Sequence, residues 1–171
     1  EAQWEYAARS SAQTPYWSGS DLTALQGVAN LLDFYGKHHG SEDWPGWEPD
    51  LDDGCAVHAP VGSFRANGFG LHDVHGNLWE WCLDGYEVGF YGESPRTDPV
   101  CTRSSEGLCM MRGGGFNYGA RFARSSGRNY YAPSNSQFFL GAQVERHAAL
   151  VAVRHQVRGA VVRRDLAEEV A

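Results

Sequence analysis

The pattern of hydrophobic and polar positions predicts a helix at the start of the chain and little regular structure after it. In residues 1–9, Trp4, Ala7 and Ala8 recur at the i, i+3, i+4 spacing of an amphipathic helix. From residue 10 to residue 115 no period is sustained, because glycine, proline, asparagine and aspartate interrupt the short apolar groups. Ordered loops of this length need aromatic side chains or metal ions to hold them in place.

The pattern predicts regular structure again toward the end of the chain. Residues 111–119 (MRGGGFNYG) are typical of a strand that enters a glycine-rich turn, and residues 136–145 (SQFFLGAQVE) indicate a further strand. In the tail, residues 144–171, four apolar residues recur at helical spacing, namely Leu150, Val153, Val157 and Val161. We expect a C-terminal amphipathic helix that packs on the body of the domain or on a partner.

Composition narrows the class to a globular domain with many turns. The chain has 171 residues, about the length of one domain, and 42% of them are hydrophobic, enough for a packed core. Its 21 glycines and six tryptophans indicate irregular backbone held by large side chains. No apolar run approaches the ~18 residues of a membrane-spanning helix, so no membrane span is expected. The chain opens on helix-interior residues without a capping residue, so we expect a missing N-terminal part of the same polypeptide as its partner.

The charge balance excludes one class of partner and is compatible with another. Fourteen lysines and arginines stand against 21 aspartates and glutamates, a formal net charge of −7. Nucleic-acid binding needs a basic face, so no nucleic-acid partner is expected. Divalent cations are compatible with this balance, although an acidic surface also serves simply to keep a domain in solution.

Two stretches concentrate oxygen ligands on bent backbone. Residues 42–53 contain six acidic residues interrupted by proline and glycine: Glu42, Asp43, Glu48, Asp50, Asp52 and Asp53. Residues 72–80 (HDVHGNLWE) place Asp73 and Glu80 on either side of Gly76. Calcium takes about six to eight oxygens from carboxylates, amides and backbone carbonyls, and both stretches suit it. The EF-hand spacing is absent, and solvated acidic loops are the alternative interpretation.

Other metal and catalytic motifs are missing. The seven histidines show no HExxH or facial-triad spacing, and the chain has neither a phosphate-binding loop nor a GxSxG nucleophile motif. The four cysteines have no CxxC spacing, so no structural zinc site is expected. Cys101 and Cys109 bracket a short polar loop, and they are either bridged in an oxidising compartment or two free thiols.

Residues 116–139 have the composition of a recognition surface. They interleave tyrosine, phenylalanine, asparagine and serine with arginine, which combines rigid aromatic contacts with adaptable hydrogen bonding. The spacing of Arg121, Arg124 and Arg128 favours one shared side of a turn-rich segment. The alternative is that the aromatic residues belong to the core and the arginines pair with acids.

Five stretches occur in the order and spacing of a known family: EAQWEYAAR, ANLLDFYG, APVGSFRANGFGLHDVHGNLWEWCLDGY, MRGGGFNYGARFARSSGRNYYAP and FFLGAQ. By these motifs residues 1–143 resemble the formylglycine-generating enzyme, or sulfatase-modifying factor, family. The resemblance implies an α+β, C-type-lectin-like fold with little regular secondary structure and long ordered loops. It also implies that the N-terminal part of the family domain precedes Glu1, and that residues 144–171 have no counterpart in the family.

The resemblance implies two structural calcium sites. Site 1 would use Asn30, the Leu31 carbonyl, Asp53 and the Cys55 carbonyl, and site 2 would use Asp73, the Gly76 and Leu78 carbonyls, and Glu80. Family members often carry asparagine at the position of Asp73, and aspartate is an equally suitable oxygen ligand. We expect Trp79 and Trp81 to pack on either side of Glu80 and to hold it in place.

Catalysis is where the sequence departs from the family. Formylglycine-generating enzymes oxidise a substrate cysteine with copper held by two cysteines, which follow the strand equivalent to residues 111–115. No cysteine follows Cys109 in this chain, so the thiolate pair that copper(I) selects is missing. Neither copper binding nor sulfatase activation is therefore expected.

Three functions remain open. The first is a non-catalytic, calcium-stabilised binding or regulatory module for a protein or small molecule, which would make the chain a pseudoenzyme. The second is a retroelement-diversified variable protein, whose variable surface would fall at about residues 116–139. The third is a fragment of an oxidoreductase, either of the formylglycine-generating type or of the iron-dependent type that makes a sulfoxide from hercynine. We predict a candidate binding surface made of Asn117, Tyr118, Arg121, Arg124, Arg128, Asn129, Tyr130 and Tyr131.

Overall fold

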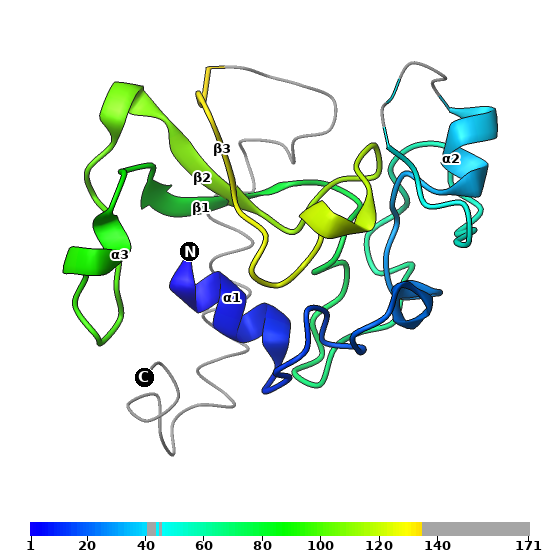
Figure 1. Cartoon of the computed structure of the whole chain (residues 1–171), viewed down its shortest axis with the longest axis horizontal. Helices are drawn as coiled ribbons and strands as arrows, with labels where there is room; N and C mark the ends of the chain where they lie inside the picture. The colour runs from blue at the N-terminus through cyan, green and yellow to red at the C-terminus, as the bar shows by residue number, and fades with distance from the viewer. Residues whose placement is uncertain (41–43, 45, 135–171) are drawn as a thin grey trace.

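The computed structural model describes residues 1–40, 44 and 46–134, and in this part of the chain long loops connect a few short elements (Figure 1). The helices are α1 (Ala2–Arg9), α2 (Phe34–His39) and α3 (Phe90–Glu93), with 3₁₀ turns η1 (Leu22–Leu25), η2 (Ser105–Gly107) and η3 (Ala120–Phe122). The strands are β1 (Glu80–Gly85), β2 (Cys109–Arg112) and β3 (Asn129–Tyr131). The expected α+β class with little regular structure is confirmed.

The three strands form one antiparallel sheet in the order β1-β2-β3, with Glu80 opposite Arg112. The strand expected within residues 111–119 is confirmed as β2, which begins two residues earlier and ends at Arg112. It ends there because Gly113 and Gly114 turn the backbone at φ values of 95° and 82°, which other residues rarely adopt. Figure 1 shows the sheet between α3 at one end of the molecule and α2 at the other.

Helix α1 packs on one face of the sheet. The apolar stripe expected at the start of the chain is confirmed, because Trp4, Ala7 and Ala8 are all buried. They form one hydrophobic cluster with Cys82 of β1 and Met110 of β2. The cluster fixes the helix against the strand on which site 2 ends.

The opposite face of the sheet carries a second apolar cluster. Trp81, Cys109 and Met111 lie in it because they alternate along β1 and β2 with the residues that face α1. Trp79, which is fully buried, joins them. Three partly buried rings that cover this cluster come from the segment after the glycine turn: Tyr118, Phe122 and Tyr131.

A buried charge network ties α1 to that same segment. Arg112 is fully buried, and its guanidinium donates hydrogen bonds to the carboxylates of Glu1 and Glu5. The guanidinium also donates to the carbonyl of Ser125 at 2.8 Å. A buried charge is tolerated only with such partners, so Arg112 fastens the start of the chain to the segment that follows β2.

Some expectations lie outside the described residues, namely the strand at 136–145 and the helix in the tail at 144–171.

None of the four cysteines forms a disulfide, so Cys101 and Cys109 are not bridged. No helix in the described part of the chain is long and apolar enough to cross a membrane.

Candidate functional site

The residues expected for site 1 come together around the carboxylate of Asp53. Its Oδ2 accepts a hydrogen bond from the Leu31 amide at 2.9 Å, and its Oδ1 accepts one from the Cys55 amide at 2.8 Å. The second bond is an Asx turn, because an aspartate side chain readily binds the backbone two residues further on. The bond from the Leu31 amide, together with one from the Asp53 amide to Asp33 Oδ2, holds residues 30–33 against residues 53–55.

Asn30 adds a buried oxygen to the same site. Its Nδ2 donates to the Val57 carbonyl at 3.0 Å and to Asn77 Oδ1 at 3.2 Å, so both amide hydrogens are used. Its Oδ1 is buried and has no hydrogen-bond partner among the described residues. A buried oxygen without a partner is unfavourable in a folded protein, and a cation would supply the missing interaction.

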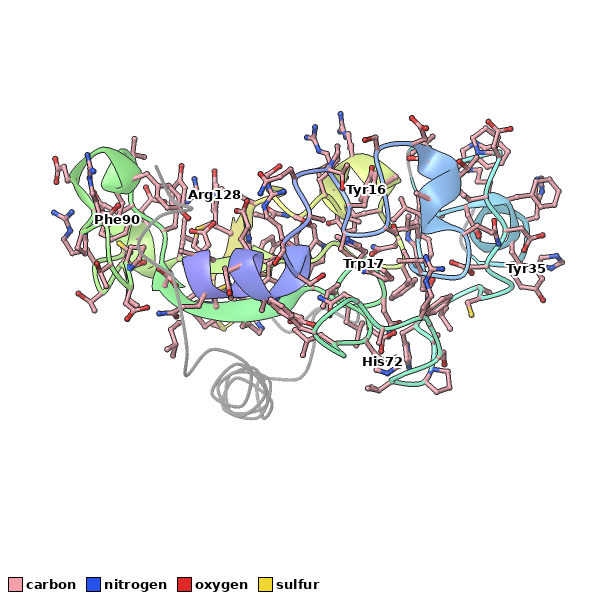
Figure 2. The ribbon with its side chains drawn as sticks, turned by 90° about the horizontal axis from the view of Figure 1, so that it is seen from below. Tyr16, Trp17, Tyr35, His72, Phe90 and Arg128 are labelled. Atoms are coloured by element: carbon pink, nitrogen blue, oxygen red, sulfur yellow. The ribbon has the colours of Figure 1, made fainter. Side chains whose placement is uncertain are left out.

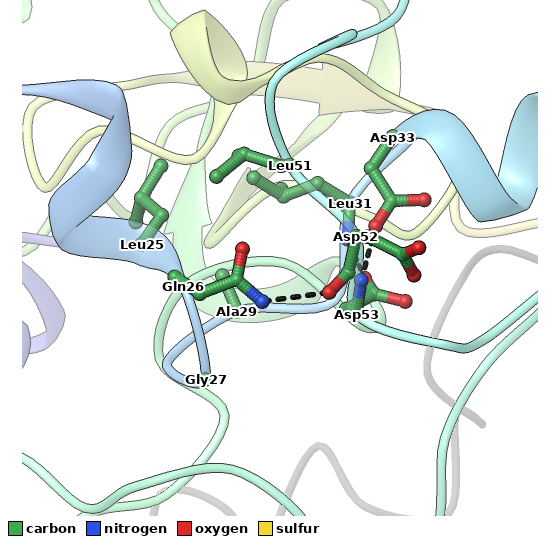
Figure 3. Close-up of a pocket in the computed structure, with 9 residues that line it drawn as sticks. All are labelled: Leu25, Gln26, Gly27, Ala29, Leu31, Asp33, Leu51, Asp52 and Asp53. Carbon is green, nitrogen blue, oxygen red and sulfur yellow. Dashed lines mark hydrogen bonds between the residues drawn. The ribbon is translucent and has the colours of Figure 1, made fainter.

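The charge around site 1 is concentrated and poorly hydrated. Asp33 is fully buried, caps α2 by accepting from the Gly36 amide at 2.9 Å, and also accepts from the Asp53 amide. Burial is the main cause that raises the pKa of Asp53 to about 7, and the neighbouring Asp33 and Asp52 act in the same direction. Figure 3 shows these three acids along one side of a small pocket. A divalent cation here would favour the ionised carboxylates again.

Site 2 is built on a loop that curls through left-handed backbone. Asp73, Gly76 and Asn77 have φ values of 56°, 76° and 62°, a region that glycine, asparagine and aspartate adopt most readily. Asp73 Oδ2 accepts from the Gly62 amide at 2.6 Å. Its Oδ1 is buried without a partner in the described part of the chain, so each predicted site holds one such oxygen.

Glu80 is held by a different indole from the two that the sequence suggested. Glu80 opens β1, so alternation along the strand turns Trp79 and Trp81 toward the cluster on the opposite face of the sheet. The expectation that these two indoles pack on either side of Glu80 is therefore wrong. The Nε1 of Trp4 in α1 donates to Glu80 Oε2 at 2.7 Å instead.

Backbone oxygens complete the fit to calcium. Four carbonyls predicted as metal ligands accept no hydrogen bond from any described residue: those of Leu31, Cys55, Gly76 and Leu78. Within the described ranges no three His, Cys, Asp or Glu side chains converge as a metal site, so an ion in either loop would draw on amide and carbonyl oxygens as well. Such an oxygen set suits calcium and not a soft transition metal.

The candidate binding surface is divided between two places. In the first, Tyr118 and Phe122 pack edge to face with 5.2 Å between ring centroids, and the guanidinium of Arg121 lies over the Phe122 ring. In the second, on the α3 side of the molecule (Figure 2), Arg128 donates to Glu1 Oε2 at 3.0 Å. Arg128 is thus engaged in an ion pair inside the chain.

The other members of the surface also have structural partners. Tyr130 stacks on Tyr86 with 3.8 Å between ring centroids, and Asn129 Oδ1 accepts from the Tyr130 amide at 2.9 Å. Arg124 Nε donates to the Arg121 carbonyl at 2.9 Å. The arginines of this segment therefore have different surroundings and do not line one shared side.

A pair of buried polar atoms lies against the backbone of Gly115, and the sequence interpretation missed it. A Cβ added to Gly115 would lie 3.4 Å from Trp79 Nε1 and 3.3 Å from Asn117 Oδ1. Neither atom has a hydrogen-bond partner among the residues described. Both distances are short for a Cβ, so residue 115 packs closely on the two groups. The only signal in the sequence is the third glycine of GGG, which allows this close approach.

Comparison with known proteins agrees with the fold. Residues 1–148 match the family described as "Sulfatase-modifying factor enzyme 1-like domain". A formylglycine-generating enzyme of Streptomyces coelicolor is 34% identical over 158 residues, which is 88% of this chain and 46% of the relative. The structure is similar to that of PvdO from Pseudomonas aeruginosa, with a TM-score of 0.65 and 29% identity over 82% of this chain and 48% of PvdO.

A second solved structure shows the shared fold alone. It is variable protein 1 of Treponema denticola, with a TM-score of 0.57 and 18% identity over 82% of this chain and 43% of that protein. The chain therefore spans a little under half the length of each of these relatives.

Proposed function

Because this chain belongs to the sulfatase-modifying factor enzyme 1-like family, we propose that it is a calcium-stabilised binding domain without the copper-dependent activity of formylglycine-generating enzymes. The observation that carries the proposal is the pair of buried oxygens without a partner among the described residues, Asn30 Oδ1 and Asp73 Oδ1. One of them lies in each loop that the family resemblance assigns to calcium.

Calcium would stabilise the loops of sites 1 and 2, which few backbone hydrogen bonds between strands hold in place. An ion in site 1 would join residues 30–33 to residues 53–55, and an ion in site 2 would draw residues 73–80 around itself. Each ion would also favour the charged form of carboxylates that burial disfavours, Asp53 above all. An ion bound by the folded state alone stabilises that state.

The thiols of the chain argue against copper chemistry. Burial raises the pKa of the Cys82 thiol to about 12, so this group stays protonated and is a poor metal ligand. Cys109 is buried in the apolar cluster of Trp79 and Trp81. No cysteine follows Cys109, so residues 116–131 supply no thiolate to a copper ion.

The variable-protein alternative draws on a shared fold alone. Its variable surface would include Tyr118, whose ring packs on Trp79, and Arg128, which pairs with Glu1. Extensive variation at such positions would disturb the fold, so we favour a fixed binding domain.

The experiment for the proposed function has a calcium arm and a copper arm. The full chain, freed of metal, is dialysed against calcium and its bound metal is counted; we expect two ions per chain. The same chain is then incubated with copper(I), oxygen and a cysteine-containing sulfatase peptide; we expect no formylglycine. A chain that binds no calcium, or one that converts the peptide, contradicts the proposal.

A further inference from the structure

The loops of the two predicted calcium sites touch through their backbones. Asn30 and Gly76 form a parallel bridge, and the Asn77 amide donates to the Asn30 carbonyl at 2.7 Å. The approach is so close that a Cβ on Gly76 would lie 2.0 Å from the Asn30 carbonyl oxygen. A metal ligand of site 1 and a metal ligand of site 2 are therefore direct neighbours.

The side chain of Asn77 reinforces this contact. Its Oδ1 accepts from Asn30 Nδ2 at 3.2 Å and from the Ala59 amide at 2.8 Å, and its Nδ2 donates to the Ala59 carbonyl at 3.2 Å. Asn77 is only 4% exposed. These bonds fix which end of each amide is oxygen, and they leave the Asn30 Oδ1 as the atom available to an ion.

We propose that Asn77 couples the two sites, so that calcium in one site raises the affinity of the other. The coupling rests on the proposed calcium sites. An ion in site 2 orders Gly76 and Leu78, the residues on either side of Asn77. Asn77 then holds the Asn30 amide in the orientation that site 1 needs, and the second ion binds a loop that is already ordered.

The sign of the coupling between the two sites distinguishes electrostatic repulsion from the contact between the loops. Two calcium ions repel each other, so electrostatics alone would make the second ion bind more weakly. Positive coupling must therefore come through the contact between the loops, and the Asn77 variant tests the part that its side chain plays. Linkage also requires that each site strengthens the other by the same factor.

The coupling is measured by calorimetric titration of the full chain with calcium. Two variants, Asp53→Asn and Glu80→Gln, each remove one charge from one site while keeping the side-chain shape, and each is expected to bind a single ion. The coupling factor is the product of the two wild-type binding constants divided by the product of the two single-site constants. We expect a factor of about five or more, the lower end of ordinary allosteric coupling.

Asn77→Gly tests the role of the side chain, because glycine accepts the φ of 62° at this position. It is expected to reduce the coupling factor to about one while the chain still binds two ions. Asn67→Ala is the matched control: Asn67 is 5% exposed and donates to the carbonyls of Ala7 and Ala8 at the end of α1. It removes a similar buried amide and should leave the coupling factor unchanged.

Each outcome bears on one proposal. A coupling factor below about five in the wild-type chain contradicts the coupling but not the calcium sites. A coupling factor that is the same in Asn77→Gly as in the wild-type chain has the same meaning. A wild-type chain that binds no calcium overturns the proposed function itself. If Asn77→Gly does not fold, the wild-type factor, compared with the two single-site variants, still decides.

Discussion

The two predicted calcium loops and the segment 116–131 are both mostly irregular backbone, but different forces hold them. Hydrogen bonds between polar groups hold the loops, such as those from the Leu31 amide to Asp53 and from the Ala59 amide to Asn77. Ring packing and the buried Arg112 hold the segment. Both regions contain buried oxygens without a partner among the described residues, Asn30 Oδ1 and Asp73 Oδ1 in the loops and Asn117 Oδ1 and Ser125 Oγ in the segment. Only the loops combine them with acidic residues, because residues 116–131 include no aspartate or glutamate. We therefore expect a cation to stabilise the loops and not the segment.

The largest effect is expected where the segment is fastened to α1. Arg112→Ala removes the buried guanidinium that pairs with Glu5 and binds the Ser125 carbonyl, and it leaves Arg128 and Arg9 as the remaining partners of Glu1 and Glu5. Breaking a buried charge pair lowers the free energy of unfolding by about 3–5 kcal/mol. Urea denaturation measures the loss. Arg124→Ala, at an exposed arginine of the same segment, should change it by no more than about 0.5 kcal/mol.

The next largest effect is expected at the contact between the loops. Gly76→Ala places a Cβ against the Asn30 carbonyl at a φ of 76° and should lower the free energy of unfolding by about 3 kcal/mol. Gly62→Ala is the control, because Gly62 also has a positive φ, 82°, but nothing lies within 4 Å of the added Cβ. Its loss should be about 1–2 kcal/mol, from backbone strain alone. Equal losses in the two variants would show that the loops do not press on each other.

A smaller effect is expected at the support of Glu80. Trp4→Phe keeps most of the packing of α1 but removes the indole N–H that Glu80 accepts, for a loss of about 1.5 kcal/mol in the free energy of unfolding. Tyr6→Phe, on the same helix, should change it by less than about 0.5 kcal/mol. Equilibrium denaturation separates the two. A neutral Trp4→Phe would show that this hydrogen bond does not support Glu80.

Spacing along the chain predicted more of the molecule than composition did. The stripe of Trp4, Ala7 and Ala8 predicted α1, and the glycines after Arg112 predicted the end of β2. These features depend on neighbours within a few residues, which a sequence displays directly. Composition predicted one binding surface within residues 116–139, but the structure divides its described members between two places.

The remaining features depend on partners far away along the chain. Arg128 pairs with Glu1 across 127 positions, and Trp4 binds Glu80 across 76. No local pattern shows such partners, because the folding of the sheet brings them together. The same holds for Trp79 and Asn117, whose buried atoms without a partner in the described part of the chain are evident only in three dimensions.

The most direct test of the account is the thermal unfolding of the full chain with calcium and with excess chelator. At a free calcium concentration of 100 times the dissociation constant, each bound ion adds about 2.7 kcal/mol to the free energy of unfolding. Chelation should therefore lower the melting temperature of the wild-type chain by several degrees, and by less in Asp53→Asn and in Glu80→Gln. Asn117→Ala, in the packed segment, should keep the full wild-type shift. A melting temperature that is the same with calcium and with chelator would contradict the account.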